Sequence, residues 1–289
     1  YYSELGGAEV WFKCENLQHT GSFKARGALN KVLSLQPTEH TCVVTASTGN
    51  HGAAVAYALR QIGLPGIVYV PEAAAATKVE AMKRWGIEVR HHGCDPLETE
   101  LYARRYAQTH RAVYIPPYND PHIIAGQGTI GLELQNQLDT IDALFVAVGG
   151  GGLISGIAVW LKAVMPGIQI VGCSPQNSAV MAHSVRAGRI LDLPSQPTLS
   201  DGTAGGVEPD AITFPLCRDL VDTWIEVSEE EIAAELLRFI ELHHMLIEGA
   251  AAVPIAAYRK LHPRFRDKRV VILLCGANIS LSTLRELLA

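Results

Sequence analysis

The chain has 289 residues, of which 48% are hydrophobic and 18% charged, so it is not an intrinsically disordered protein. Its net charge of −5 excludes the strongly basic surface that is typical of nucleic-acid-binding proteins. The six cysteines form no Cys-x-x-Cys pair, which excludes zinc ribbons and thioredoxin-type chemistry, and their low density favours reduced thiols in a cytoplasmic protein.

Short apolar strands alternate with longer helical patterns along the chain. The first clear strand covers residues 41–46, and it is followed by the turn Ser-Thr-Gly-Asn-His-Gly and a helix. A helix after Ser228 begins with a capping box that Glu231 completes. Further strands are predicted at residues 66–70, 87–90, 113–115, 143–148, 169–173, 224–227 and 269–274. Near-continuous apolar strands that alternate with helices predict an α/β fold with mostly parallel sheets, covered on both faces.

One uncharged run, residues 143–161, is long enough to suggest a membrane-spanning helix. Four consecutive glycines lie in its middle, and each lowers helix stability by about 1 kcal/mol relative to alanine. A buried strand, a glycine turn and a helix therefore fit this run better. The first residues include Glu4 and Glu9 and do not resemble a signal peptide, and we expect an upstream segment because the chain opens with Tyr1.

The glycine loop, made of Gly149, Gly150, Gly151 and Gly152, follows a predicted strand and precedes a helix. Glycines let backbone N–H groups converge, and a helix start adds the positive end of its dipole, so the loop is predicted to bind phosphate. Its spacing matches neither G-x-G-x-x-G nor G-x-x-x-x-G-K-[ST]. A small cofactor with one phosphate is therefore favoured over a dinucleotide or a nucleoside triphosphate. A tight turn packed on the sheet is the alternative without a ligand.

Two further loops carry chemically useful side chains. Ser47, Thr48, Asn50 and His51 follow the strand at residues 41–46, and their hydrogen-bond donors suit a carboxylate, although an ordinary helix cap also explains them. Cys275 follows the last strand, where a thiol can hydrogen-bond a heteroaromatic nitrogen or serve as a buried structural side chain. These loops are candidates for a binding site because ligands of parallel α/β folds lie beyond the carboxyl ends of the strands.

Lys24 lies beside Phe23 near the start of a helix that is predicted from about Ser22. An enclosed, partly apolar site favours the neutral amine, which then serves as a nucleophile and a base. On these residues alone, a solvated surface lysine is the more ordinary explanation. The histidine pairs at residues 91–92 and 243–244 lack the helical spacing of metal ligands, so we interpret them as surface or boundary residues.

Seven motifs resemble, in the same order, those of the serine/threonine dehydratases, which are tryptophan-synthase-β-like (fold type II) enzymes that use pyridoxal 5'-phosphate (PLP). The motifs are TGSFKARGAL, ASTGNHG, IAGQGT, GGGGLISG, the Asp-Gly of SDGTAGG, LIEGAAA and CGAN. The resemblance covers essentially the whole chain and replaces the ordinary explanation of Lys24. It implies two three-layer α/β lobes with the cofactor between them. The large PLP-binding domain would comprise residues 1–40 and 116–289, and the small substrate-binding domain residues 41–115.

The resemblance also implies roles for individual residues. Lys24 would form the Schiff base with PLP and, once freed, remove the Cα proton of the substrate. The neutral thiol of Cys275 would face the pyridine nitrogen, which suits rapid β-elimination better than a long-lived carbanion. The residues expected to bind the cofactor are Phe23, Lys24, Asn50, Gly149, Gly150, Gly151, Gly152, Leu153, Gly202, Glu248 and Cys275. Those expected to contact the substrate are Ser47, Thr48, Asn50, His51, Tyr118 and Gly205.

The activity implied by the resemblance is the dehydration of a β-hydroxy-α-amino acid, such as L-threonine or L-serine, to a 2-oxo acid and ammonia. Serine racemases, which are close relatives, use a serine as the opposite-face acid/base where this chain has Thr48. The hydroxyl permits some racemisation, but the β-branched side chain is stiffer, so serine racemase is the second hypothesis. Dehydratases of hydroxyaspartate or aryl-serines are further alternatives, because Gly205 leaves room for a larger β-substituent. An alternative of another class is a catalytically silent ligand-binding protein.

The resemblance also bears on metals and partners. The racemases bind a divalent ion through an acidic pair where this chain has Ser174 and Val180, so we expect no metal there. A homodimer is implied, and neither a nucleic acid nor a membrane is expected as a partner. Because the chain ends at Ala289, soon after CGAN, we also expect no regulatory domain.

Overall fold

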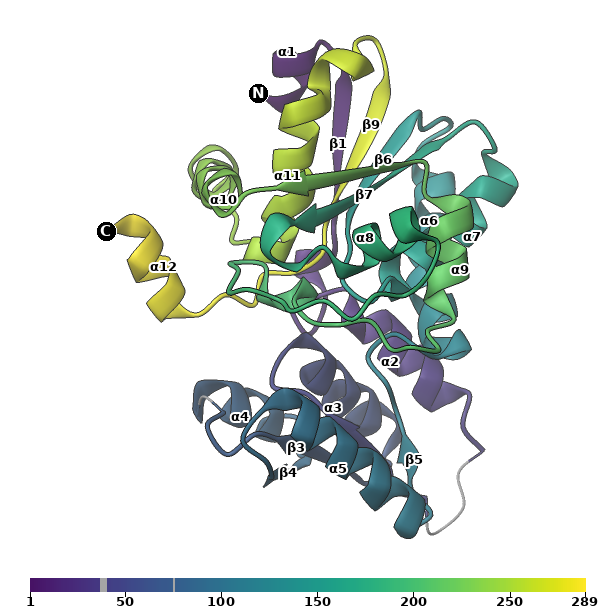
Figure 1. Cartoon of the computed structure of the whole chain (residues 1–289), viewed down its shortest axis with the longest axis vertical. Helices are drawn as coiled ribbons and strands as arrows, with labels where there is room; N and C mark the ends of the chain where they lie inside the picture. Colours follow the sequence, from purple (N-terminus) through teal and green to yellow (C-terminus); the bar gives the residue numbers. More distant parts are fainter. Residues whose placement is uncertain (37–40, 75) are drawn as a thin grey trace.

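Two parallel sheets organise the molecule, which is seen here in a computed structural model that describes residues 1–36, 41–74 and 76–289 (Figure 1). The larger sheet has the strand order β1 (Glu9–Cys14), β9 (Arg269–Leu274), β6 (Ala143–Ala147), β7 (Gln169–Pro175) and β8 (Thr223–Val227). The smaller sheet has the order β4 (Glu88–His91), β3 (Gly66–Val70), β2 (Val43–Ala46) and β5 (Val113–Tyr114). All pairings within both sheets are parallel, which confirms the predicted fold class.

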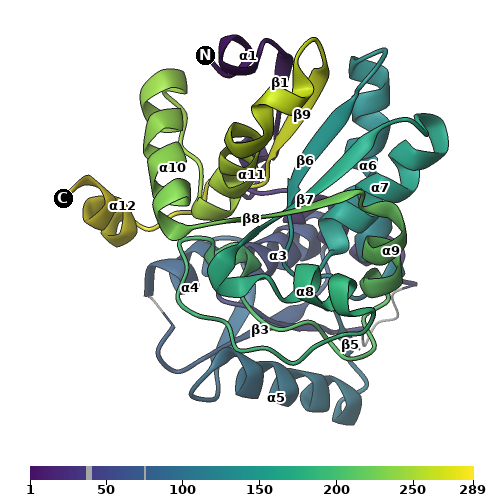
Figure 2. The same ribbon diagram turned by 45° about the horizontal axis from the view of Figure 1, so that its top comes forward.

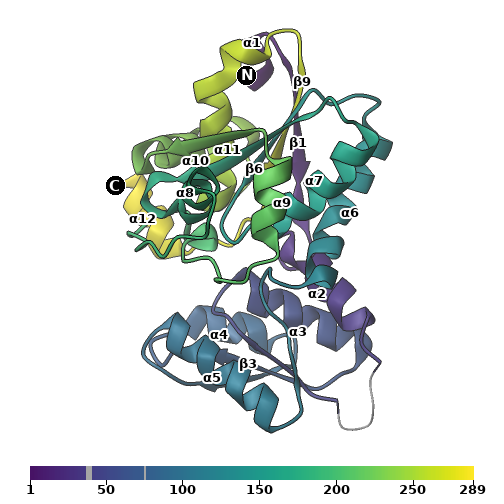
Figure 3. The same ribbon diagram turned by 45° about the vertical axis from the view of Figure 1, so that its right-hand side comes forward.

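Helices cover both faces of each sheet (Figure 3). On the larger sheet, α10 (Glu229–His243) and α11 (Gly249–Leu261) lie on one face, and α6 (Pro121–Gln137) and α7 (Gly152–Val164) lie on the other. On the smaller sheet, α3 (Asn50–Ile62) and α4 (Ala76–Lys83) lie opposite α5 (Pro96–Thr109). The remaining helices are α1 (Tyr2–Gly6), α2 (Lys24–Leu33), α8 (Val180–Ala187), α9 (Thr213–Leu220) and α12 (Leu281–Leu288), with short 3-10 turns at Glu15–Leu17, Gln176–Ser178, Asp201–Thr203 and His262–Phe265.

The two central strands of the smaller sheet, β2 and β3, are largely apolar because alternate residues enter two different cores. Val43 and Val68 pack with residues of α3, whereas Val44 and Ile67 pack with Ala103 of α5. A strand that is buried on both faces has no position for a polar alternation, and this explains the continuous apolar runs in the sequence. The larger sheet has a single core cluster that includes fully buried residues of β6, β7 and β9.

Helix α2, whose first residue is Lys24, lies at the junction of the two lobes (Figure 3). Its Ala28 and Val32 belong to the core cluster of the smaller sheet. The helix approaches α6 closely, because a Cβ added to Gly126 would lie 2.6 Å from the Cα of Gly27. Two glycines thus allow the contact that positions the start of α2. The predicted domain boundary after residue 40 falls at residues 37–40, which lie outside the described part of the chain.

Some local features differ from the sequence prediction. Strand β1 was not predicted, and the helix expected from about Ser22 begins at Lys24, while Ser22 forms an isolated antiparallel bridge with Gly276. The glycine run lies between a strand and a helix, as predicted. The last helix, α12, extends away from the larger sheet (Figure 2). Within the described residues, no helix combines the length and the apolar character needed to cross a membrane.

Candidate active site

A cavity lies where loops beyond the carboxyl ends of β6 and β9 meet the first residues of α2 and α3. This is the position at which parallel α/β folds bind ligands. Twelve of its lining residues were predicted: Phe23, Lys24, Asn50, Tyr118, Gly149, Gly150, Gly151, Gly152, Leu153, Gly202, Glu248 and Cys275. The other lining residues are Pro117, Gln127, Ala147, Thr203, Ala204, Gly206 and Ala250. Residues from distant parts of the sequence are therefore brought together in one cavity.

Lys24 contributes a primary amine to this cavity. Its Nζ donates a 2.7 Å hydrogen bond to the carbonyl oxygen of Pro117 and lies 5.3 Å from the centre of the Phe23 ring. Burial lowers the pKa of Lys24 from 10.5 to about 8, although attraction to Cys275 and Glu248 acts in the opposite direction. A much larger fraction of this amine is neutral near pH 7 than of an ordinary lysine.

The glycine loop leaves no space for side chains. Gly151 is the N-cap of α7 and has a left-handed backbone with φ of 85°, which favours glycine. A Cβ at Gly149 would lie 2.8 Å from the carbonyl oxygen of Thr203, and one at Gly152 would lie 2.9 Å from the Cβ of Tyr118. The first N–H groups of α7 have no partner within the helix, so the loop and the helix start together form a site suited to an anion.

A buried carboxyl group joins three of the loops. Glu248 accepts two 3.0 Å hydrogen bonds from Nδ2 of Asn50 and one of 3.1 Å from the backbone N–H of Asn278. The Asn278 side chain in turn donates a 2.6 Å hydrogen bond to Oδ1 of Asn50. Burial raises the pKa of Glu248 to about 7, while its hydrogen bonds from Asn50 and Asn278 lower it. These contacts hold the first residue of α3 against the larger lobe.

Cys275 lies at the end of β9 with only 2% of its surface exposed. Its Sγ lies 3.9 Å from Oε1 of Glu248, and burial raises the pKa of the thiol well above its ordinary value. The side chain is therefore a neutral thiol at physiological pH.

The predicted substrate-binding loop is only partly directed at the cavity. Among the described residues of this loop, Asn50 lines the cavity, whereas Ser47 and Thr48 lie beside it with partly exposed side chains. The Ser47 hydroxyl accepts a 3.1 Å hydrogen bond from the backbone N–H of Gly49. His51 is buried behind the loop, with Nε2 3.0 Å from the carbonyl oxygen of Ile115, and burial lowers its pKa to about 3. His51 is thus a neutral imidazole.

Gly205 lies on the surface, between the cavity residues Ala204 and Gly206. A Cβ at this position would meet nothing within 4 Å, but the backbone has φ of +125°, which side chains other than glycine rarely adopt. The space beside Gly205 is therefore open, although a substitution would strain the backbone.

Several residues in or next to the cavity received no predicted role although their motifs were recognised. Asn278 belongs to CGAN, Thr203 and Ala204 to SDGTAGG, and Gln127 to IAGQGT. Gln127 accepts a 3.2 Å hydrogen bond from the backbone N–H of Gly27 and so supports the start of α2. A search for polar side chains within each recognised motif would have found Asn278 and Gln127.

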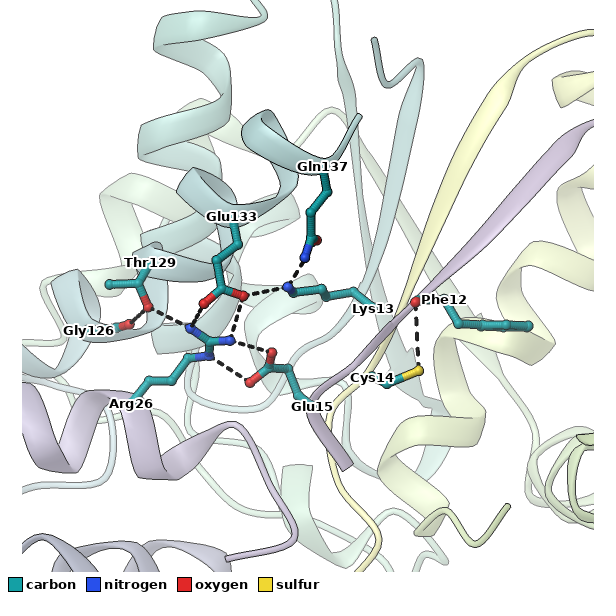
Figure 4. A network of polar contacts seen from close by, with 9 residues as sticks. All are labelled: Phe12, Lys13, Cys14, Glu15, Arg26, Gly126, Thr129, Glu133 and Gln137. Carbon is teal, nitrogen blue, oxygen red and sulfur yellow. Dashed lines mark hydrogen bonds and ion pairs between the residues drawn. The ribbon is translucent and has the colours of Figure 1, made fainter. Parts of the chain in front are cut away.

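The outer side of α2 carries a second cluster of charges (Figure 4). The Arg26 guanidinium makes two hydrogen bonds to Glu15, of 2.7 and 2.8 Å, and two to Glu133, of 2.6 and 2.8 Å. Nη1 also donates to Thr129 at 3.1 Å, and the amine of Lys13 lies 2.5 Å from Glu133. We name this cluster the Arg26 network; it joins β1, α2 and α6 at the back of the Lys24 site.

Within the described residues, no group of three or more histidine, cysteine, aspartate or glutamate side chains is arranged to hold a metal ion. At one of the positions compared with the racemase metal site, Ser174 is buried and its hydroxyl donates a 3.3 Å hydrogen bond to the carbonyl oxygen of Val148. The predicted absence of a divalent ion stays a prediction.

Comparison with known proteins agrees with this architecture. An L-threonine ammonia-lyase of Geobacter sulfurreducens is 40% identical over 98% of this chain and 71% of its own length, and a serine racemase of Arabidopsis thaliana is 38% identical over 98% and 86%. The solved structure of threonine deaminase isoform 2 from Solanum lycopersicum superposes with a TM-score of 0.94 at 33% identity, covering 99% of this chain and 84% of that one. Residues 1–276 match the family described as pyridoxal-phosphate dependent enzymes. The chain therefore belongs to the pyridoxal-phosphate-dependent enzyme family, with the fold type II architecture of these relatives.

Proposed function

We propose that the protein is a PLP-dependent dehydratase that converts a β-hydroxy-α-amino acid, most simply L-threonine or L-serine, to a 2-oxo acid and ammonia. The observation that carries this proposal is the amine of Lys24, which lines a cavity together with a glycine-rich helix start and a neutral thiol. The names of the relatives support the same reaction class, since both threonine ammonia-lyase and threonine deaminase are among them.

The residues of the cavity fit PLP in three respects. The glycine loop, in which added Cβ atoms at Gly149 and Gly152 would clash, suits the phosphate, because it offers backbone N–H groups at a helix start. Lys24 offers a partly neutral amine for a covalent link to the aldehyde. Cys275 offers a neutral hydrogen-bonding group for the ring nitrogen, and Phe23, Asn50, Leu153, Gly202 and Glu248 would border the ring.

The chain's own residues would share the chemistry as follows. When bound, the cofactor supplies an electron sink for the charge left at Cα. Lys24 would take the Cα proton, because the carbonyl of Pro117 accepts one N–H of the amine and leaves its lone pair free. Because Cys275 is a neutral thiol, it would not hold a proton on the ring nitrogen, which favours early loss of the β-hydroxyl over a stable carbanion.

The substrate carboxylate would bind beside the start of α3. Asn50 would bind it with its side-chain amide. Ser47 and Thr48 would bind it with their hydroxyls, together with backbone N–H groups of the same loop. His51 would support this loop from behind, because its pKa of about 3 leaves it neutral and its single N–H is directed at the carbonyl of Ile115. Tyr118 and the open space beside Gly205 would adjoin the β-substituent.

A serine racemase is the second candidate, and one observation favours it: the partly exposed hydroxyl of Thr48 in the loop beside the cavity. Such a hydroxyl could exchange a proton with the second face of Cα. The stiffness of the β-branched side chain opposes this role, and we therefore rank racemisation below dehydration.

The test begins with the protein as purified, supplemented with PLP. We expect a visible absorption band that borohydride abolishes, with the reduced cofactor attached to Lys24 in a peptide map. The protein is then assayed for 2-oxo acid with L-threonine, L-serine, 3-hydroxyaspartate and phenylserine, with chiral analysis of the remaining substrate. Release of 2-oxo acid supports the dehydratase. Inversion without 2-oxo acid identifies a racemase, and a protein that stays colourless and inactive identifies a silent binding protein.

The assembly, the location and the domain roles belong to the same proposal. We propose a cytoplasmic homodimer in which residues 1–40 and 116–289 bind the cofactor and residues 41–115 the substrate. Sedimentation of the purified protein measures the oligomeric state, and a monomer at all concentrations would contradict the dimer.

A further inference from the structure

Residues 201–208, which we name the pocket segment, form one wall of the cavity. Gly202, Thr203, Ala204 and Gly206 line it directly. The segment lies between α8 and α9, where the chain runs along the edge of the larger lobe that faces the smaller lobe (Figure 1). Its middle is held to the larger lobe, because the backbone N–H of Gly205 lies 3.1 Å from the hydroxyl of Ser178 and 3.2 Å from that of Ser195.

Each end of the pocket segment carries a carboxylate that pairs with a cation of the smaller lobe. At one end, Glu208 lies 3.1 Å from the guanidinium of Arg104 on α5. At the other end, Asp201 lies 3.5 Å from the amine of Lys78 on α4. The pair at Glu208 is the less exposed: 22% of the Glu208 side chain and 34% of the Arg104 side chain are accessible to solvent. For the other pair the accessible fractions are 61% for Asp201 and 38% for Lys78. The Arg104 pair is therefore less screened by solvent and is expected to be the stronger one.

Glu208 is also connected to the wall of the cavity through Tyr118. Its backbone N–H donates a 2.8 Å hydrogen bond to the Tyr118 hydroxyl, and its Oε2 accepts a 2.9 Å hydrogen bond from Asn119. The Tyr118 ring lines the cavity and covers the glycine loop, since a Cβ at Gly150 would collide with the ring. A movement of Glu208 would therefore displace both the pocket segment and the ring.

Arg104 is itself held in place from two sides. It hydrogen-bonds Glu100, one turn earlier on α5, at 2.7 Å, and its guanidinium lies 4.6 Å from the centre of the Tyr114 ring. A cation fixed in this way loses little further side-chain entropy when it pairs with Glu208, and this removes one of the costs that weaken an average surface ion pair.

We propose that Arg104 and Glu208 are positioning residues that hold the pocket segment and Tyr118 against the substrate, with Lys78 and Asp201 as a weaker second pair. This inference rests on the proposed function for its substrate. Neither Arg104 nor Glu208 lines the cavity, so both act through other residues. Their loss should weaken substrate binding more than it slows the chemical steps at Lys24, because in the described part of the chain neither residue hydrogen-bonds Lys24 or the glycine loop.

The test compares Arg104→Gln and Glu208→Gln with two controls at exposed neighbouring positions: Arg105→Gln on α5, and Asp210→Asn just after the pocket segment. With L-threonine and L-serine, we expect the first two variants to raise KM about 5- to 30-fold while kcat stays within about threefold. The exchanged pair Arg104→Glu with Glu208→Arg should restore part of the wild-type KM. Added salt should raise the KM of the wild-type enzyme more than that of either single variant.

Unchanged KM in both single variants, or equal changes in the Arg105→Gln control, would overturn the proposal. Hydrogen exchange of the PLP-loaded protein separates this failure from failure of the proposed function. Faster exchange of amides 203–208 in Arg104→Gln than in Arg105→Gln supports the positioning role even if no tested amino acid is turned over, and equal exchange contradicts it.

Discussion

Lys24 and Arg26 stand two residues apart on the first turn of α2, yet the protein treats their positive charges in opposite ways. Cations are unfavourable at a helix start, because the dipole places partial positive charge there. The charge of Arg26 is offset by the carboxylates of Glu15 and Glu133, each bound through two hydrogen bonds (Figure 4). Lys24 has no such carboxylate partner in the described residues; its amine binds a neutral carbonyl, and its pKa falls to about 8.

The contrast between Arg26 and Lys24 shows that one helix turn can contain both a stabilising ion-pair network and a partly neutral amine. The inner part of the Arg26 network is buried, with 2% of the Glu15 side chain and 13% of the Arg26 side chain exposed, whereas Glu133 is 41% exposed; the network fixes the helix against β1 and α6. With the helix held from behind, the amine on the other side needs no ion pair for its position and can remain partly neutral. Removing Lys24 should therefore affect chemistry, and removing Arg26 should affect stability.

The largest expected effect follows from Lys24→Ala. We expect 2-oxo acid release to fall by about 10³-fold or more, because the acid/base group and the covalent anchor are both lost. PLP should still bind without a covalent link, since the glycine loop is intact. Steady-state assays and equilibrium dialysis with PLP measure the two quantities. Lys83→Ala, at an exposed position of α4, is the control, and near-wild-type turnover in Lys24→Ala would refute the role of the Lys24 amine.

The next largest effect concerns Arg26→Gln, which leaves Glu15 buried without its cation. We expect a loss of about 3–5 kcal/mol in unfolding free energy, the usual result of breaking a buried pair from one side. The double variant with Glu15→Gln should lose less, because no buried charge remains. Urea unfolding followed by circular dichroism provides the comparison. If Arg26→Gln and the double variant were equally stable, the charges of Arg26 and Glu15 would not offset each other.

The smallest effect separates two carboxyl groups by pH. Hydrogen bonds from Arg26 lower the pKa of Glu133 to about 2, so its ionised form stabilises the fold above pH 4.5, and this contribution is lost as the pH falls toward 2. Burial raises the pKa of Glu248 to about 7, so its protonated form stabilises the fold below pH 4.5, and this contribution, of the order of 3 kcal/mol, is lost as the pH rises through 7.

Glu133→Gln and Glu248→Gln test this directly in the cofactor-free protein. The unfolding free energy of the wild type minus that of Glu133→Gln should rise with pH between 2 and 4.5. The same difference for Glu248→Gln should fall between pH 4.5 and 7. If both differences in unfolding free energy changed with pH in the same direction, the pKa values of Glu133 and Glu248 would not be shifted in opposite directions.

The sequence was most informative where burial produces a recognisable pattern within one short segment. Strand β2 could be predicted because Val43 and Val44 are buried on opposite faces, which requires an apolar run. Strand β1 could not, because it is an edge strand that pairs with β9 and carries Glu9 at an exposed position and Lys13 at a partly exposed one. An edge strand needs no continuous apolar pattern, so its sequence resembles a loop.

The candidate site was predictable in its motifs but not in its contacts. Lys24 could be selected through the order of seven motifs, whereas its low pKa results from burial in a cavity that is lined by residues far away in the sequence. The orientation of His51 toward the carbonyl of Ile115 likewise arises from packing between segments. Spacing within a motif contains no information on such contacts.

The pairing of β1 with β9, together with the bridge between Ser22 and Gly276, has a consequence for biosynthesis. The edge strand beside the lysine segment finds its partner only after β9, which follows 260 residues later along the chain, has left the ribosome. At about 5–20 residues per second, the nascent chain waits on the order of ten seconds or more before this closure. Long-range closure of this kind also slows folding, so the early part of the chain is a natural client for chaperones during translation.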